Sequence, residues 1–171
     1  MFRSSPPKLL LFAALVSLLF LSGCNMNVFH DSISTTVEMS STEAQVAHAT
    51  SKRFKFERDV AGAKSARIQR AWVSVDLPEG QDLSFIASVD VTMKHPDTGE
   101  ILHLVTGGGF KPGESVKELE VLYGEDIRDM VRDQRVTLDW DVQPNLLYRG
   151  FGEEELMLAL RFGIVLEIEV P

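Results

Sequence analysis

The chain has a single cysteine, Cys24, among its 171 residues. One thiol cannot form a disulfide within the chain, so the fold has to be stable through its core alone. Basic residues are also in the minority, with 17 Lys and Arg against 25 Asp and Glu, and a chain this acidic is a poor nucleic-acid binder. The sequence therefore predicts a domain that has no internal disulfide and binds no nucleic acid.

Motifs for catalysis and metal binding are equally scarce. No serine lies in GxSxG, and the glycine run 106–109 lacks the GK[ST] ending of a phosphate-binding loop. No HxH or HxxxH pair occurs among the four histidines, which are His30, His48, His95 and His103. The acidic pairs Asp139/Asp141 and Glu167/Glu169 lie at i, i+2, a spacing typical of the solvent face of a strand. We therefore expect no metal site, no cofactor and no enzymatic activity.

The N-terminus has the pattern of a secretory signal. Residues 1–8 carry two positive charges and no acidic residue, and the thirteen residues 9–21 are apolar except for Ser17. A transmembrane helix needs about twenty apolar residues, so this run is too short to span a membrane. We expect residues 1–23 to be a signal peptide.

The tetrapeptide Leu21-Ser22-Gly23-Cys24 resembles the lipobox of bacterial lipoproteins, in which an apolar residue and two small ones precede a cysteine. The resemblance implies cleavage before Cys24 and attachment of diacylglycerol to its sulfur, usually with acylation of the new amino terminus. Asn25 is not the Asp that retains some lipoproteins in the inner membrane, so the resemblance favours the outer membrane of the cell envelope. It extends over residues 1–25 and implies nothing about the fold.

Removal of residues 1–23 leaves 148 residues, which suit one domain. The remaining chain has 15 Lys and Arg and 25 Asp and Glu, which gives a net charge of about −10. Residues 24–32 have no clear period and predict a lipidated tether. The period of two that starts at Ile33 predicts a domain over 33–171.

A basic stretch interrupts this acidic chain. Residues 52–70 hold seven Lys and Arg and two acidic residues, and the stretch begins with Lys52, Arg53, Lys55 and Arg58. Two interpretations remain open. The stretch either faces anionic lipid headgroups or an acidic partner, or it forms the solvated faces of strands that pair with acidic strands nearby.

Alternation of apolar and polar residues recurs along the rest of the chain. It predicts seven or eight strands separated by turn signals, with inward sets such as Ile33/Thr35/Val37/Met39 and Val136/Leu138/Trp140/Val142. Residues 125–134 instead place Ile127, Met130 and Val131 at i, i+3 and i+4, which predicts one short helix. The fold class predicted is therefore an all-β, antiparallel, immunoglobulin-like β-sandwich with one short helix.

One hairpin is specified in detail by the turn Pro96-Asp97-Thr98-Gly99. A four-residue connection there would pair Met93 with Leu102 and Val91 with Leu104, and it would place His103 opposite Thr92 on the outer face.

The loop 106–113 contains Phe110 and Lys111 between glycines. Phe110 is either an exposed aromatic contact or a side chain that folds back to cap the core. Trp72 is the second aromatic candidate, since it lies opposite Val73 and Val75; it either packs under a second layer or marks an interaction face.

We expect from these features a membrane-anchored, non-catalytic envelope lipoprotein whose domain binds another protein or supports an assembly. The alternative is a module that binds a glycan, lipid or peptide at the loop ends or along a sheet edge, and a deep apolar pocket in the domain core would favour it. Fold alone does not decide between them.

Overall fold

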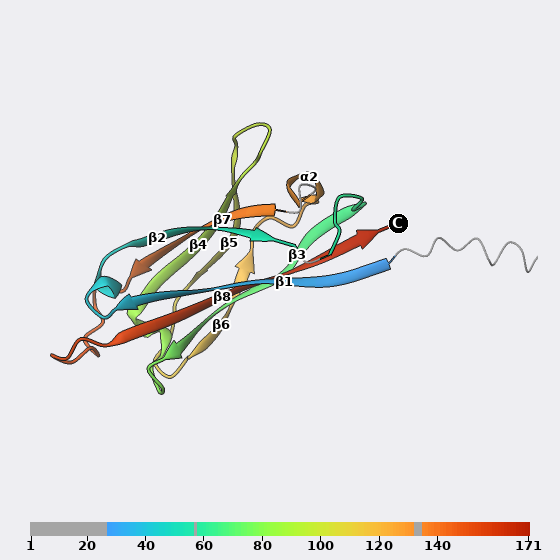
Figure 1. Ribbon diagram of the computed structural model, residues 1–171. Coiled ribbons are helices and arrows are strands. Elements are labelled where there is room, and N and C mark those ends of the chain that lie inside the picture. The colour runs from blue at the N-terminus through green and yellow to red at the C-terminus, as the bar shows by residue number, and fades with distance from the viewer. Residues whose placement is uncertain (1–26, 57, 132–134) are drawn as a thin grey trace, which may run out of the picture.

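The computed structural model describes residues 27–56, 58–131 and 135–171 (Figure 1). The predicted signal peptide and Cys24 lie outside these residues. Eight strands make up most of the fold, and the connections between them include two 3-10 turns (Glu43–Gln45 and Leu83–Phe85) and the short helix α2 (Arg128–Val131). The strands are β1 (Asn27–Ser40), β2 (His48–Lys55), β3 (Ser65–Leu77), β4 (Ile86–Lys94), β5 (Ile101–Gly108), β6 (Val116–Val121), β7 (Arg135–Pro144) and β8 (Met157–Val170).

The strands follow the order β1-β8-β3-β6-β5-β4-β7-β2, and every pair is antiparallel. Two four-stranded layers result, β1-β8-β3-β6 and β2-β7-β4-β5, with the register Val105↔Val121 and Thr106↔Glu120 joining them along one side. The predicted class, an antiparallel all-β sandwich with one short helix, is confirmed. Its connectivity is that of an eight-stranded jelly roll, because β1, β2 and β3 alternate between the layers. An immunoglobulin fold would instead pair its first two strands with each other.

The core lies between the two layers. The predicted inward sets of β1 and β7 are buried, and the rings of Trp140 on β7 and Phe162 on β8 stack across the core with centroids 4.7 Å apart. Both residues are at most 1% exposed. Ile127, Met130 and Val131 are also buried, so the predicted apolar face of the helical segment is confirmed. No helix among the described residues has the length and apolar character needed to cross a membrane.

The hairpin between β4 and β5 is partly as predicted. Gly99 closes the turn with a φ of 73°, Met93 lies opposite Leu102, and His103 lies opposite Thr92. The prediction that Val91 pairs with Leu104 is wrong, because a register shift after Val91 places Val105 opposite Val91. The bulge buries both Leu104 and Val105. Alternation alone cannot reveal such an insertion.

The predicted tether also needs a correction. β1 begins at Asn27, so residues 27–32 belong to the sheet and lie opposite Val165 to Val170 of β8. Backbone pairing, and not a hydrophobic period, holds this segment, since Val28 is exposed and Phe29 is half-buried. Only Asn25 and Met26 separate Cys24 from β1 in the sequence.

Candidate functional site

The two ends of the sandwich are built differently. We call one the loop end: it holds the connections 41–47, 78–85, 109–115 and 145–156. The other, the α2 end, holds the start of β1, the end of β8, helix α2 and the connections 58–64 and 95–100. Figure 1 shows the loop end at the lower left and α2 near the C-terminus at the opposite end.

Exposed apolar side chains concentrate at the loop end. Nine large hydrophobic residues are exposed in the described part of the chain, and six of them lie here: Val46, Leu77, Val116, Leu146, Leu147 and Met157. The other three, Val28, Ile101 and Leu122, lie toward the α2 end. Leu146 and Leu147 are the most exposed of all, at 73% and 84%. These two are neighbours in sequence, and adjacent exposed apolar side chains mark an interaction site more often than isolated ones do.

The two leucines lie on a rigid turn. The backbone N–H of Tyr148 donates to the carbonyl of Asn145 (2.9 Å), which closes a turn with Leu146 and Leu147 at its centre. The Asn145 amide donates to the carbonyl of Ser84 (2.8 Å), and its oxygen accepts from the Leu147 N–H (3.1 Å). These contacts hold both leucines outward by hydrogen bonds to the buried turn Leu83–Phe85.

Three aromatic rings pack together beside this turn. Phe85, Tyr148 and Phe151 lie with ring centroids 4.8 to 6.1 Å apart, in edge or tilted arrangements. The Tyr148 hydroxyl accepts a hydrogen bond from the Gln81 amide (3.0 Å). The loop end is therefore an ordered surface.

Asp82 ties two of the loop-end connections together. One carboxylate oxygen accepts from the Ser84 backbone and hydroxyl, and the other accepts from the Gly113 N–H (2.7 Å). Burial alone would raise the pKa of Asp82, but these hydrogen bonds outweigh it and hold the pKa below its usual value. At the same end, the Lys111 N–H lowers the pKa of Glu114, with help from the Lys117 ammonium.

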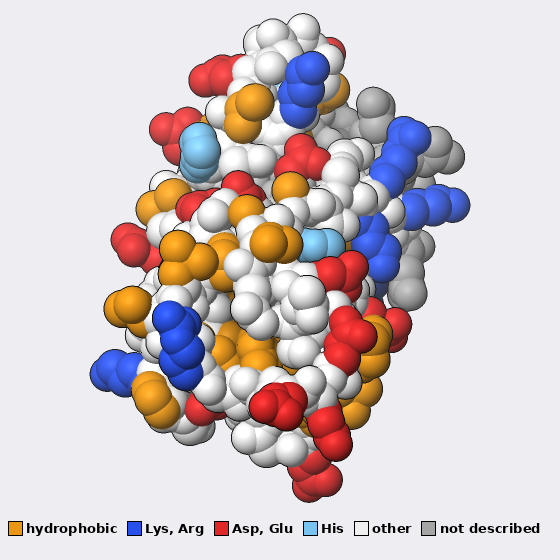
Figure 2. Space-filling model, turned by 90° about the vertical axis from the view of Figure 1, so that its left-hand side faces the viewer, with side chains coloured by type: hydrophobic (Ala, Val, Ile, Leu, Met, Phe, Trp, Pro, Cys, Tyr) orange, Lys and Arg blue, Asp and Glu red, His pale blue; other side chains and the backbone are white. Residues whose placement is uncertain are grey.

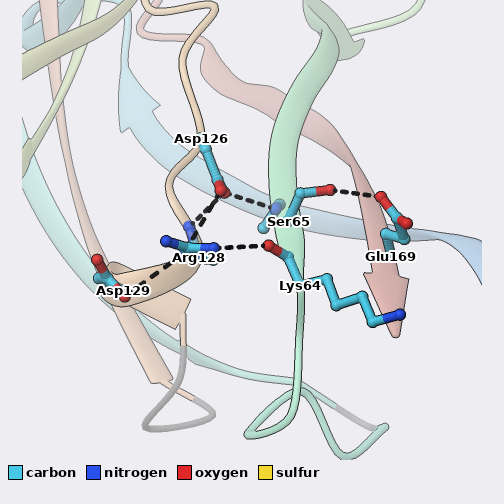
Figure 3. Close-up of polar contacts among 7 residues, drawn as sticks. Lys64, Ser65, Asp126, Arg128, Asp129 and Glu169 are labelled. Carbon is cyan, nitrogen blue, oxygen red and sulfur yellow. Dashed lines mark hydrogen bonds and ion pairs between the residues drawn. The ribbon is translucent and has the colours of Figure 1, made fainter. Parts of the chain in front are cut away.

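The α2 end is closed by polar contacts instead (Figure 3). One Asp126 carboxylate oxygen accepts from the backbone N–H of Ala66 (2.9 Å) and of Arg128 (3.0 Å). The Arg128 guanidinium donates to the Lys64 carbonyl (3.0 Å) and forms an ion pair with Asp126. The Ile127 N–H also donates to the Ala66 carbonyl (2.8 Å). The polar groups of Asp126 and Arg128 are thus bonded to the protein itself.

Phe110 and Lys111 do not form an exposed aromatic contact. Phe110 is 8% exposed, so the capping alternative is the one found. The Lys117 ammonium lies 5.1 Å from the centroid of the Phe110 ring and donates to the Gly109 carbonyl (3.1 Å). Lys111 is exposed beside it.

Trp72 lies on the outer face of its layer and is half-buried. Its ring covers Gly163 on the neighbouring strand β8, where any side chain would overlap the indole. The Arg70 guanidinium lies 5.9 Å from the ring. Trp72 therefore packs against a glycine of its own sheet, with no second layer above it in the described structure.

The basic candidates Lys52, Arg53, Lys55 and Arg58 are all exposed. Lys52, Arg53 and Lys55 lie on the edge strand β2, and no ion pair to them is found within the described residues. Arg58 packs its guanidinium 4.9 Å from the Phe29 ring centroid. Figure 2 shows Lys and Arg side chains along the upper right margin of the molecule, directly above acidic side chains.

The outer face of the β2-β7-β4-β5 layer carries a shallow open hollow of about 530 Å³. Asp90, Asp139, Asp141 and His103 line it, and the Thr106 hydroxyl donates to Asp90 (2.7 Å). Across the described residues, no three His, Cys, Asp or Glu side chains converge closely enough to hold a metal ion.

The interior is filled. The apolar space between the layers near Ile33, Leu104 and Ile164 measures about 10 Å³, which is below the size of a ligand site. A ligand within the core, the expected sign of a lipid- or glycan-binding module, has no room in the described structure.

Sequence reasoning missed Leu146, Leu147 and Asp31, which lines a cleft described below. Two adjacent leucines between the turn signal Pro144-Asn145 and Gly150 were the available sign, because no strand pattern covers them. For Asp31 the available sign was its spacing: it lies two residues from both Phe29 and Ile33, and therefore on the same face of β1.

Comparison with known proteins gives no family. No family model and no curated protein matches the chain. Solved structures that resemble it include a Desmodium yellow mottle tymovirus structure (12% identity, TM-score 0.38, covering 100% of this chain and 95% of that one). A decameric BFDV capsid protein has 8% identity and a TM-score of 0.32 over 83% of this chain and 99% of its own. A turnip yellow mosaic virus structure has 9% identity and a TM-score of 0.30 over 100% and 89%.

Proposed function

We propose that the protein is a bacterial envelope lipoprotein, anchored through Cys24 to a membrane that we take to be the outer one. Its jelly-roll domain is non-catalytic and docks on a partner protein through the loop end. The observation that carries the docking proposal is the outward display of Leu146 and Leu147 on an ordered turn.

The position of Cys24 in the sequence supports the orientation. Two residues separate it from β1, and a chain of that length reaches about 10 Å at most. A lipid on Cys24 would therefore keep the α2 end close to the headgroups. β1 has 14 residues and spans about 45 Å, so the loop end would point away from the membrane.

The charge of the loop end limits the kind of partner. Its four connections hold seven acidic residues, including Glu153, Glu154 and Glu155, and two basic ones, Lys111 and Arg149. Apolar side chains in an acidic surround complement an apolar patch with a basic rim. We expect the partner to present such a patch.

Labelling with radioactive palmitate tests the anchor. Wild-type protein should incorporate label and sediment with membranes, whereas Cys24→Ala should do neither, because it removes the thiol that the lipid modifies. Unchanged labelling in Cys24→Ala would overturn the assignment.

Copurification from detergent-solubilised membranes tests the contact. The double variant Leu146→Asp/Leu147→Asp should lose a stoichiometric partner, while Ile101→Asp, an equally apolar exposed position at the α2 end, should retain it. Equal retention by both variants would contradict docking through the loop end.

A further inference from the structure

The two long sides of the sandwich differ in how they are closed. On one side β6 pairs with β5 and joins the layers. On the other side β1 and β2 are the last strands of the order, and no ladder joins them in the described residues. A cleft of about 280 Å³ separates them; Asp31, Ser32, Ile33 and Ser34 line it from β1, and Phe54, Lys55 and Phe56 from β2 and its end.

The free edge of β1 has few of the features that protect edge strands from pairing: the inward-pointing charge of Asp31 is one of them, and Lys, Pro and bulges are missing. Proteins usually guard such edges with Lys, Pro or bulges. The 14 residues Asn27–Ser40 contain no Lys, Arg or Pro, and their register with β8 is uninterrupted. β2, in contrast, carries Lys52, Arg53 and Lys55. The backbone of β1 is thus the open pairing surface of the cleft.

A carboxylate oxygen in this cleft has no donor. Asp31 is half-buried with its side chain on the inward face of β1, and its Oδ2 is buried without a hydrogen-bond partner. A buried carboxylate oxygen is costly unless a donor or cation satisfies it. Ile33, Phe54 and Phe56 contribute apolar side chains to the wall, and Ser32, Ser34 and Lys55 contribute polar ones, so the cleft combines the unpaired acceptor with a mixed surface.

We propose that this cleft binds an extended segment of a partner protein, which adds a strand to the free edge of β1. Asp31 and Ile33 lie two residues apart on one face. A paired strand presents its own side chains with the same period, so the segment has a Lys or Arg opposite Asp31 and an apolar residue two positions away. This site is separate from the loop end and does not depend on the proposed contact there.

An array of ten-residue peptides tests the proposal, probed with the full lipidated protein in detergent. The peptides vary at two positions two residues apart, with Lys, norleucine or Glu at the first and Leu or Ser at the second. We expect Lys-x-Leu peptides to bind at least tenfold more tightly than Glu-x-Leu or norleucine-x-Leu peptides. N-methylation of alternate peptide nitrogens should abolish binding, because strand addition needs the backbone hydrogen bonds.

Asp31→Asn should reduce the preference for Lys to less than twofold, with Asp139→Asn on the outer face of β7 as the matched control. If Asp31→Asn does not fold, the binding of Lys-x-Leu and norleucine-x-Leu peptides to the wild-type protein still tests the proposal. Absence of binding by every peptide, an unchanged preference in Asp31→Asn, or tolerance of N-methylation would overturn the proposal. So would an Asp31-dependent dimer, which would make the cleft an interface between copies of this chain.

Discussion

The α2 end and the loop end each have a carboxylate that accepts backbone hydrogen bonds, but the loop end also displays two adjacent exposed leucines. At the α2 end, Asp126 and Arg128 bond to the backbone of Lys64 and Ala66, so polar groups are used to hold the fold (Figure 3). At the loop end, hydrogen bonds from Asn145 hold a turn whose leucines contact little else. The difference indicates that one end is built to close the domain and the other to present a surface.

The largest effect is expected from a substitution in the core that both ends share. Phe162→Ala should lower the free energy of unfolding by about 3–5 kcal/mol, because the ring is fully buried and stacks on Trp140. Urea denaturation measures this change, and hydrogen exchange should show both ends opening together. A loss below about 1 kcal/mol would mean that the layers do not pack as described.

Asp126→Ala should weaken only the α2 end. It removes the acceptor of the N–H groups of Ala66 and Arg128, which should lower the free energy of unfolding by about 0.5–1.5 kcal/mol, because these contacts are partly exposed to water. The control is Asp97→Ala in the exposed hairpin turn at the same end, expected to change it by less than about 0.5 kcal/mol. Equal effects from the two variants would contradict a role for Asp126 in closing the α2 end.

Acid should loosen the loop end at Asp82. The pKa of Asp82 is lowered in the folded state, so its contribution to stability is present above the unfolded pKa and is lost as the pH falls through the folded value. The amide signal of Gly113, which donates to Asp82, should therefore shift below about pH 4 in an NMR titration. The amide of Leu122, bonded to the Leu104 carbonyl, serves as the reference. Persistence of the Gly113 shift in Asp82→Asn would assign it to another group.

The smallest expected effect is on stability at the proposed docking surface. Leu147→Asp should change the free energy of unfolding by less than about 0.5 kcal/mol, because the side chain is 84% exposed. Thermal unfolding of the purified variant measures this. A large loss would show that Leu147 serves the fold and not an external contact.

Alternation predicted the strands well where one face is buried. Val136, Leu138, Trp140 and Val142 are all inward, as their spacing indicated. It failed where backbone pairing decides, as at Asn27, whose strand continues beside β8 without a hydrophobic period. It also failed at the bulge after Val91, where one extra residue changes the pairing but not the pattern.

The candidate site was harder to predict than the fold. The sequence offers Phe110, near glycines, and Trp72, on a strand face, as aromatic candidates. Phe110 is buried, and Trp72 covers Gly163, a residue distant in sequence. Leu146 and Leu147 become notable only when the turn that carries them is placed at the end of the sandwich. Their exposure depends on the contact of Asn145 with Ser84, 61 residues away.

Site-specific photocrosslinking in intact cells tests the central claim most directly. A photoreactive amino acid at position 147 should give one adduct of defined mass, and the same group at position 101, also exposed but at the α2 end, should give none. An adduct at position 101 without one at 147, or no adduct at either, would contradict a lipoprotein that docks through its loop end.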